Sequence, residues 1–463
     1  MDRIRVSRIQ VKNLFGNINY DIKIPENSNV SIITAPNGRG KTTILNLVSF
    51  VLSPNEDSFY ALQTIPFDEF RCTLSNEKVI ELKQKQKETK LVRTNNDTLS
   101  RSMREQIELR GRIFFESVNF IFSVYNNNLD KPVSSIDFSQ IFNDVSRSGI
   151  KELLSDNDGD EELYRLYRNS IMHGSRISFY LLFIFKKLEE LLEDNNCKLP
   201  INFIKANRIQ PVSIPPRRMR DADEIPQKSP LESASEDISN RIKVATDIYN
   251  ESVSQAKDRL PQMFIAGDNI KLSYKEFMKG WTTYREELVQ FQKIGIITPT
   301  KDFTMGKDIS KVYEDKGLFL STYLSAFKDT TAPLKEIYKR LSLFKDILDE
   351  RNAITGKKVV FDREGVCLLA SNRKLNLDAL SSGEKHDFIM FYNLIFNIGN
   401  NGLVLVDEPE ISLHIEWQET YLDKLLTICE MNGLQAIVAT HSPSIISNHY
   451  DLLVDKGDND GED

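Results

Sequence analysis

The sequence predicts an α/β protein whose parallel sheet is built from segments near both ends of the chain, with a long, mainly helical insertion between them. Three observations predict this class. An apolar run at residues 29–35, NVSIITA, ends at a glycine-rich loop that a helical pattern follows. Two later apolar runs, at residues 403–407 and 434–440, end in acids and in Thr-His. Between them, residues 236–350 keep a helical spacing of apolar positions.

The N-terminal segment is expected to form strands and one helix. IRVSRIQVKNL and INYDIKIP alternate apolar and polar residues around a turn at residues 15–17, which is typical of half-buried strands. After the glycine loop, KTTILNLVSFVL has helical spacing, and Pro54 ends this helix. Residues 67–93 predict a hairpin with its turn at residues 75–77.

The middle of the chain is expected to be mainly helical. Residues 100–200 predict helices, and ISFYLLFIFKKLEELLED has one continuous apolar face. INFIKANRIQ, from residue 201, predicts a buried strand, and five prolines at residues 211–230 predict an exposed loop. Because heptads are not sustained over residues 236–350, we expect helical hairpins or a short coiled coil, not a long arm.

The C-terminal segment returns to strands. KKVVFDREGVCLLA, at residues 357–370, predicts a hairpin with its turn near Gly365. A loop then opens a helix at LSSGEKHDFIMFYNLIF. The runs LVLVD and LQAIVAT predict buried parallel strands, and the acidic tail DKGDNDGED is expected to be disordered.

Composition limits the function classes. The formal net charge is −7 and the pI about 5.6, which argues against non-specific binding to nucleic-acid phosphates. The four cysteines form no C-x-x-C pair, so we expect reduced thiols and no zinc site. The N-terminus has no apolar signal stretch, and the apolar run near residues 179–185 is too short to span a bilayer. We therefore expect a cytoplasmic protein with no membrane partner.

The glycine-rich loop APNGRGKTT predicts a phosphate site. Its backbone N–H groups and the positive end of the following helix would bind phosphate oxygens. Lys41 would neutralise the β- and γ-phosphates, Thr42 would hold Mg²⁺, and Thr43 would bond the α-phosphate. Ala35 stands where the usual pattern has its first glycine, and a chance glycine turn is the alternative. The predicted ATP-binding residues of the loop are Asn37, Gly38, Arg39, Gly40, Lys41, Thr42 and Thr43.

Two later strands end in side chains that suit hydrolysis. Asp407 would hold the Mg²⁺ water shell, and Glu408 would act as general base on the attacking water. The alternative is a surface acid pair that caps the next helix. His441, after the third strand, would reach a γ-phosphate with an imidazole N–H; otherwise it is a satisfied core or capping histidine.

A second anion-binding turn is predicted at LSSGEK, residues 380–385. Small residues and a glycine at a helix N-terminus can present a hydroxyl and a backbone N–H to a phosphate. The turn lies about 340 residues after Lys41 but just before the Asp407 strand. The residues predicted to bind nucleotide here are Ser381, Ser382, Gly383 and Glu384.

These four motifs, in this order, make the chain resemble an ABC-type ATPase head of the SMC-like kind, split in sequence by the insertion. The resemblance covers residues 1–80 and 355–455. In that family two heads sandwich two nucleotides. It implies that the loop, Asp407, Glu408 and His441 act in cis and that Ser382 and Gly383 act in trans.

The resemblance also implies further site residues and a domain plan. Gln63 would sense Mg²⁺, while Ser412 and His414 of EISLH would couple the two nucleotide sites. We expect residues 1–95 to form the first half of the head and residues 351–455 the second half. Between them, residues 96–350 are expected to form a helical oligomerisation region with a Pro-rich loop at 211–230, and residues 456–463 an acidic tail.

Within that class, EPEISLH, THSPSII and INFIKANRIQ resemble the OLD-like ATPases of bacterial anti-phage defence. OLD proteins carry a TOPRIM nuclease after the ATPase, and the residues after His441 leave no room for one. The resemblance is greatest to the ATPase subunit of the PARIS system, with the Septu ATPase subunit second.

The resemblance implies an ATP-hydrolysing sensor and scaffold. Its implied partners are a second copy of itself, a separate effector nuclease that it restrains and releases, and a phage-encoded trigger protein. The alternative from another class is an SMC-type DNA-repair or DNA-tethering ATPase, although DNA is a less favoured partner of this acidic chain. The ATPase half of a transporter is a third, weaker alternative.

Overall fold

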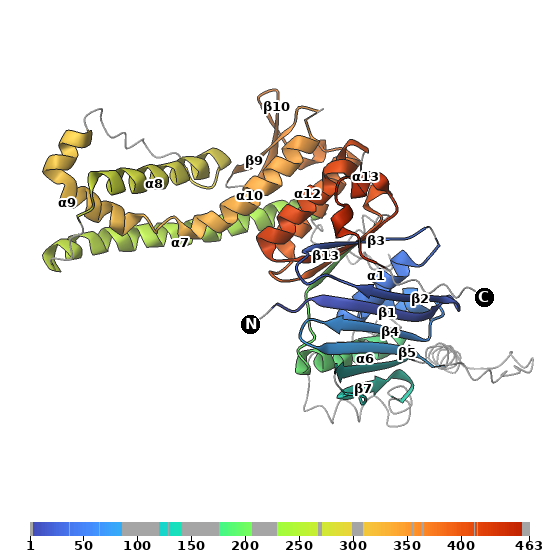
Figure 1. Ribbon diagram of the computed structural model, residues 1–463. Coiled ribbons are helices and arrows are strands. Elements are labelled where there is room, and N and C mark those ends of the chain that lie inside the picture. Colours follow the sequence, from blue (N-terminus) through green and yellow to red (C-terminus); the bar gives the residue numbers. More distant parts are fainter. Residues whose placement is uncertain are drawn as a thin grey trace, which may run out of the picture. The chain divides into compact units, whose positions relative to one another are not determined.

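The computed structural model divides into two compact units, one formed by Met1–Arg208 with Ile398–Asp463 and the other by Ile209–Asn397 (Figure 1). The residues that the structure describes are 3–36, 38–63, 65–85, 120–127, 129–140, 176–205, 229–266, 271–298, 309–353, 355–362, 365–411, 413 and 415–455.

An antiparallel sheet in the first unit has the strand order β2-β1-β4-β5-β6-β7. Alternate residues of its strands are buried, for example Ile9 and Val11, because successive side chains of a strand point to opposite faces. The strands are β1 (Val6–Leu14), β2 (Ile18–Lys23), β4 (Glu69–Leu74), β5 (Lys78–Gln84), β6 (Phe120–Asn126) and β7 (Ser134–Asp137).

A parallel sheet in the same unit has the order β3-β13-β12-β8. It joins β3 (Val30–Thr34), β13 (Gln435–Thr440), β12 (Leu403–Asp407) and β8 (Ile201–Lys205). Every residue of β12 and β13 is buried, which explains their continuous apolar sequence. All four strands run in one direction, so the loops that follow them leave the same edge of the sheet.

Helix α1 (Lys41–Leu52) packs between the two sheets, since it contacts β4 and β5 as well as β12 and β13. Around it lies an aromatic cluster that α2 (Glu56–Gln63) and α6 (Arg176–Asp194) complete. Phe59 is at its centre, with its ring 5.8 Å from those of Phe50 and Phe185 and 6.4 Å from that of Phe120. The first unit also contains α12 (Ile415–Asn432) and α13 (Pro443–Ile446), with 3-10 turns η3 (Pro409–Ile411) and η4 (Tyr450–Leu452).

The second unit is mainly helical. In Figure 1, α7 (Pro230–Ala266) and α10 (Ala332–Arg351) run alongside each other, and the two helices are in contact. A smaller core of Phe277, Trp281 and Tyr313 joins α8 (Tyr274–Ile294) to α9 (Ile309–Phe327). The other elements are β9 (Lys358–Asp362), β10 (Gly365–Ala370), β11 (Arg373–Leu375), η1 (Leu377–Ala379), α11 (Ser382–Tyr392) and the π-helical turn η2 (Asn393–Asn397).

The structure confirms the predicted α/β class, the strand–loop–helix context of the glycine loop and the helical hairpins of the insertion. The prediction that residues 100–200 are mostly helical is wrong at β6 and β7, because FIFSVYN and SSID extend the antiparallel sheet beyond β5. Residues 86–93, residues 211–228 of the proline-rich loop and the acidic tail at residues 456–463 lie outside the described residues, and Pro230 begins α7.

The division into units also differs from the boundaries expected at residues 95 and 351. Strands β6, β7 and β8 belong to the sheets of the first unit. β6 pairs with β5 and β8 with β12, which the outer segments supply, and β7 pairs with β6. Residues 351–397 belong to the second unit, where α11 contacts α7 and α10. No helix in the described parts of the chain is long and apolar enough to cross a bilayer.

Phe59→Ala is expected to destabilise the first unit by about 3–5 kcal/mol, because it removes the central ring of a packed aromatic cluster. Urea unfolding followed by fluorescence measures this loss. The matched control is Tyr60→Ala on the same helix, where the side chain is 42% exposed and the expected loss is under about 1 kcal/mol. Equal losses would show that the cluster does not organise α2.

Candidate nucleotide site

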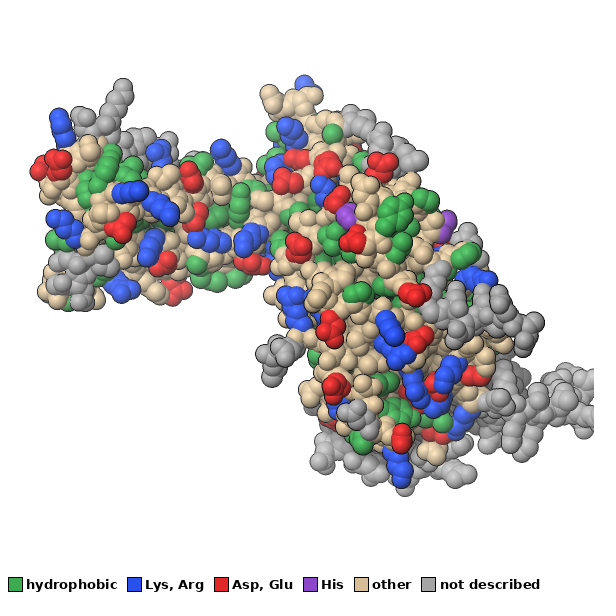
Figure 2. Space-filling view, in the orientation of Figure 1, with side chains coloured by type: hydrophobic (Ala, Val, Ile, Leu, Met, Phe, Trp, Pro, Cys, Tyr) green, Lys and Arg blue, Asp and Glu red, His purple; other side chains and the backbone are tan. Residues whose placement is uncertain are grey.

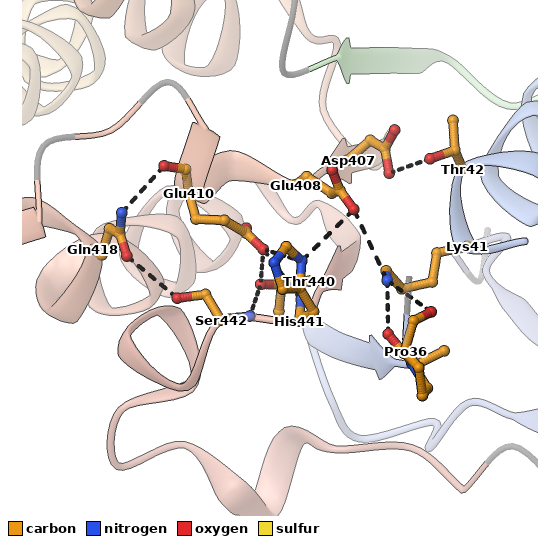
Figure 3. Close-up of polar contacts among 11 residues, drawn as sticks. Pro36, Lys41, Thr42, Asp407, Glu408, Glu410, Gln418, Thr440, His441 and Ser442 are labelled. Atoms are coloured by element: carbon orange, nitrogen blue, oxygen red, sulfur yellow. Dashed lines mark hydrogen bonds and ion pairs between the residues drawn. The ribbon is translucent and has the colours of Figure 1, made fainter. Parts of the chain in front are cut away.

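The glycine loop connects β3 to α1 and folds around the Lys41 ammonium. Gly38 and Gly40 have φ of 81° and 84°, the left-handed region that favours glycine. Lys41 is 5% exposed, and its Nζ donates to the carbonyl oxygens of Ala35 at 2.7 Å and Pro36 at 3.4 Å. The ammonium is therefore held inside the loop by the loop's own carbonyls, at the N-terminus of α1 (Figure 3).

The antiparallel sheet supports this loop from the outside. The Tyr20 hydroxyl on β2 donates to the Arg39 carbonyl at 2.6 Å. A Cβ on Gly40 would come within 2.6 Å of Leu14 Cδ2 and 3.1 Å of Phe15 Cε2, so the end of β1 packs against the loop. Sequence reasoning missed Tyr20, and only its inward place in the alternation of β2 could have indicated it.

Thr42 and Asp407 meet although they are far apart in sequence. The Thr42 hydroxyl donates to Asp407 Oδ1 at 3.1 Å, and the Thr42 carbonyl accepts from Asn46 Nδ2 at 2.9 Å. Asp407 ends β12 and is 7% exposed. Burial raises the pKa of the Asp407 carboxyl, the Thr42 hydroxyl opposes this, and the negative charge of Glu408 adds to it.

The Glu408 carboxylate lies between Lys41 and His441 (Figure 3). Its Oε1 is 3.9 Å from Lys41 Nζ and 3.7 Å from His441 Nδ1. Glu408 has φ of 44°, a conformation that costs a residue other than glycine on the order of 1–3 kcal/mol. Its N–H donates to the Ala439 carbonyl at 2.8 Å. Asp407 and Glu408 therefore face the glycine loop, which excludes the alternative of a helix-capping surface pair.

His441 follows β13, and its side chain is 43% exposed. Its Nδ1 lies 3.0 Å from Glu410 Oε1. Glu410 also accepts hydrogen bonds from the Thr440 hydroxyl at 2.8 Å and the His441 backbone N–H at 3.1 Å. Sequence reasoning missed Glu410, although a second acid two residues after Glu408, at the end of a buried strand, is a signal that could have found it.

The predicted second anion turn lies in the other unit, at the N-terminus of α11. Ser381 is its N-cap and forms a capping box with Glu384: Glu384 N donates to Ser381 Oγ at 3.3 Å, and Ser381 N donates to Glu384 Oε2 at 2.6 Å. Gly383 has open space where a Cβ would stand. Helix α11 therefore begins at Ser382, and the space beside Gly383 in its first turn is open.

Glu384 is engaged inside its own unit. Lys357 Nζ lies 2.8 Å from Glu384 Oε2, and the Thr355 hydroxyl donates to Oε1 at 3.1 Å. Burial raises the pKa of Glu384, but the hydrogen bonds from Lys357, Ser381 and Thr355 together outweigh it and lower the pKa below its usual value. This carboxylate holds the turn in shape, and the nucleotide contact expected of it stays a prediction.

The structure describes two of the remaining predicted site residues, Gln63 and Thr43. Gln63 ends α2, and its Nε2 is buried without a hydrogen-bond partner in the described structure. Asn37, Ser412 and His414 lie outside the described residues. Thr43 is buried on α1, one residue after Thr42.

The structure thus brings Lys41, Thr42, Asp407, Glu408 and His441 together at one edge of the parallel sheet. It places the turn of Ser381–Glu384 in the second unit. Among the described residues, no three His, Cys, Asp or Glu side chains are arranged to hold a metal ion by themselves.

A buried lysine in a glycine loop, a threonine bonded to a strand-end aspartate and a neighbouring glutamate define a nucleotide-hydrolase class of site. The family model described as "AAA ATPase domain" matches residues 5–446. The chain belongs to this ATPase family, and its ATPase domain is divided in sequence by the mainly helical insertion.

Comparison with curated proteins gives a relative in Septu protein PtuA of Bacillus thuringiensis. The two are 28% identical over 149 residues, which is 29% of this chain and 37% of the relative. The matched region therefore spans little more than a third of that protein's length.

Comparison with solved structures gives two Smc head domains. One is the Smc head domain with an extended coiled coil, bound to the C-terminal domain of ScpA and derived from Pyrococcus furiosus. It is 14% identical, with a TM-score of 0.35 over 96% of this chain and 91% of that chain. The other, with a coiled coil and joint and derived from Pyrococcus yayanosii, is 12% identical, with a TM-score of 0.33 over 96% and 93%.

Gly40→Ala and Gly38→Ala separate two properties of the loop. Both place a side chain at positive φ, a strain of about 1–2 kcal/mol, but a Cβ at Gly38 meets nothing within 4 Å. We expect Gly40→Ala to weaken binding of a fluorescent ATP analogue at least tenfold more than Gly38→Ala, because it also displaces Leu14 or the loop. Equal affinities of the two variants would show that close contact with β1 does not shape the site.

Proposed function

We propose that the protein binds and hydrolyses ATP as the sensor and scaffold subunit of an anti-phage defence complex. The observation that carries the ATPase step is the convergence of Lys41, Glu408 and His441 beside the Thr42–Asp407 pair. Lys41 supplies a positive charge for the phosphates, Glu408 a base for the attacking water and His441 an N–H donor. Phosphoryl transfer requires such groups around one point.

Binding rests on the loop and on α1. The Lys41 ammonium exchanges its contacts with the Ala35 and Pro36 carbonyls for phosphate oxygens, and the N–H groups of the first turn of α1 face the same point. The Tyr20–Arg39 hydrogen bond keeps the outer part of the loop in place. Preorganised donors of this kind cost little reorganisation when the substrate arrives.

Mg²⁺ fits the oxygen donors of Thr42 and Asp407. This ion takes oxygen ligands and keeps waters and substrate phosphates among them, and the Thr42 hydroxyl and Asp407 Oδ1, 3.1 Å apart, are ligands of that kind. Bound Mg²⁺ would neutralise charge on the β- and γ-phosphates. The side-chain Nε2 of Gln63 is buried and lacks a hydrogen-bond partner in the described structure. We propose that this side-chain amide senses the bound Mg²⁺.

For hydrolysis, we assign Glu408 as the general base that orients and deprotonates the attacking water. Its carboxylate is 24% exposed, so water has access to it. Lys41 Nζ, 3.9 Å away, and His441 Nδ1, 3.7 Å away, flank its Oε1. His441 is proposed to donate from its imidazole to the γ-phosphate.

Two copies of the chain are proposed to complete the site. Ser382 and Gly383 start α11 in the second unit, and the open space at Gly383 allows a phosphate of another copy's nucleotide to approach. The capping box and Lys357 hold this turn in shape beforehand. ATP binding would therefore pair two heads, and hydrolysis would release them.

The defence role is supported by the similarity to a Septu protein together with the OLD-like motifs of the sequence. The similarity to PtuA favours a Septu-type complex over a PARIS-type complex. In either, the partners are a separate effector nuclease and a phage-encoded trigger, and the ATP-bound assembly holds the nuclease until the trigger arrives.

A DNA-repair or DNA-tethering ATPase is the second candidate. Its support is the Smc-like arrangement of motifs in sequence. The net charge of −7 counts against it, and Figure 2 shows acidic side chains interspersed among the basic ones on the face in view. Salt-sensitive binding of duplex DNA that depends on ATP would favour this candidate.

Glu408→Gln is expected to retain ATP binding and to accumulate as a paired head, while turnover falls about 10²–10⁴-fold because the base is lost. Phosphate release measures turnover, and light scattering with ATP measures pairing. The control, Glu430→Gln, makes the same change at an exposed position of α12 and should leave both unchanged. A Glu408→Gln protein that fails to pair would contradict the two-copy site.

Lys41→Ala is expected to abolish phage protection in cells that carry the neighbouring genes, whereas Lys23→Ala, an exposed lysine on β2, should retain it. Full protection by Lys41→Ala would overturn the nucleotide-gated role.

A native pull-down with ATP, read by mass spectrometry, identifies the partner. An HNH-type nuclease indicates a Septu-type complex, and a TOPRIM-type nuclease indicates a PARIS-type complex. Recovery of DNA alone favours the repair candidate.

A further inference from the structure

Glu410 is a buried carboxylate beside the candidate site to which the proposed chemistry assigns no role. Its side chain is 9% exposed. A carboxylate removed from water is costly unless donors compensate it. Its Oε1 has three neighbours, which are the Thr440 hydroxyl at 2.8 Å, the His441 backbone N–H at 3.1 Å and His441 Nδ1 at 3.0 Å. Its Oε2 is buried without a hydrogen-bond partner in the described structure.

These contacts define how the imidazole of His441 is held. A carboxylate at one ring nitrogen selects the proton on that nitrogen and the orientation of the ring, as in other histidines whose second nitrogen does chemistry. With Nδ1 beside Glu410, the opposite nitrogen, Nε2, is the one that substrate can meet. Glu408 Oε1, 3.7 Å from Nδ1, adds a second negative charge, which Lys41 partly offsets.

The loop that carries Glu410 is itself held from α12. Gln418 Nε2 donates to the Glu410 carbonyl at 3.1 Å and to the Leu413 carbonyl at 3.2 Å. Gln418 Oε1 accepts from the Ser442 hydroxyl at 3.2 Å. Ser442 N–H in turn donates to the Thr440 hydroxyl at 3.0 Å. These bonds join the segment after β12 to the segment after β13 (Figure 3).

We propose that Glu410 is a positioning residue that acts through His441. It holds Nδ1 so that Nε2 is directed at the γ-phosphate, and it ties this orientation to the segment of residues 409–413. The inference rests on the proposed ATP hydrolysis, because it gives His441 a substrate to meet. A displacement of residues 409–413 would therefore turn the imidazole and change turnover while the glycine loop kept its nucleotide.

A purely structural role makes a different prediction. If Glu410 served only to accept from Thr440 and the His441 N–H, then Glu410→Gln, whose amide oxygen also accepts, would mainly cost stability. Any loss of turnover would be independent of the imidazole, so it would multiply with the loss caused by His441→Gln. The coupling between the two side chains therefore distinguishes the two roles.

The experiment is a double-mutant cycle of Glu410→Gln and His441→Gln on the full chain, with kcat and the KM for ATP measured by phosphate release. We expect Glu410→Gln to lower kcat about 10–100-fold, the range found when a partner that orients a histidine is lost, with KM within about threefold. The double variant should be no slower than His441→Gln alone. Glu419→Gln, exposed on α12, is the matched control.

Three results would overturn the inference: a Glu410→Gln kcat equal to that of Glu419→Gln, a loss confined to KM, or losses that multiply in the double variant. Gln418→Leu keeps the carboxylate but frees its segment, so it tests the idea if Glu410→Gln does not fold. It should lower kcat and be masked by His441→Gln, and an unchanged kcat would count against the proposal. Wild-type protein that releases no phosphate, or releases it equally with Glu408→Gln, would refute the ATPase proposal itself.

Discussion

The parallel pairing of β3, β13 and β12 is the constraint on which the site depends. These strands come from opposite ends of the chain, and their register places Thr34 beside Thr440 and Ala439 beside Asp407. Because parallel strands end at one edge, the segments that follow them meet there. The Thr42–Asp407 hydrogen bond spans 365 positions of sequence and is possible only in this register, since a shift of one residue would turn Asp407 to the other face.

The second sheet supports that edge. Helix α1 lies between the two sheets and carries Lys41 and Thr42 at its N-terminus. The antiparallel sheet contributes the Tyr20 hydroxyl bond to the loop and the close approach of Leu14 to Gly40. Phe50 of α1 packs on Phe59, which in turn packs on Phe185, so the aromatic cluster holds α1 in place. Residues with no chemical role thus decide where the Lys41 ammonium and the Thr42 hydroxyl lie.

Several titratable side chains lie close together within the site. Lys41 and His441 flank Glu408, and Thr42 partly compensates the burial of Asp407. The positive φ of Glu408 directs its carboxylate towards this cluster, and the strain is sustained by the bond from its N–H to β13. Lys41, Glu408 and His441 therefore link the glycine loop to the segments after β12 and β13.

The sequence by itself determined the fold class, the strand–loop–helix around Lys41 and the candidates Asp407, Glu408 and His441, because buried parallel strands and phosphate loops leave strong local patterns. Only the tertiary structure decided the rest. FIFSVYN proved a strand because β5 offered it a free edge to pair with. Local patterns give only weak signals for Tyr20 and Glu410, which packing brings to the glycine loop and to His441. Glu384, which forms a local capping box with Ser381, is also held by Lys357 and Thr355 from an earlier segment. Side-chain partners between distant segments depend on how the elements pack, and a single sequence carries no direct record of that packing.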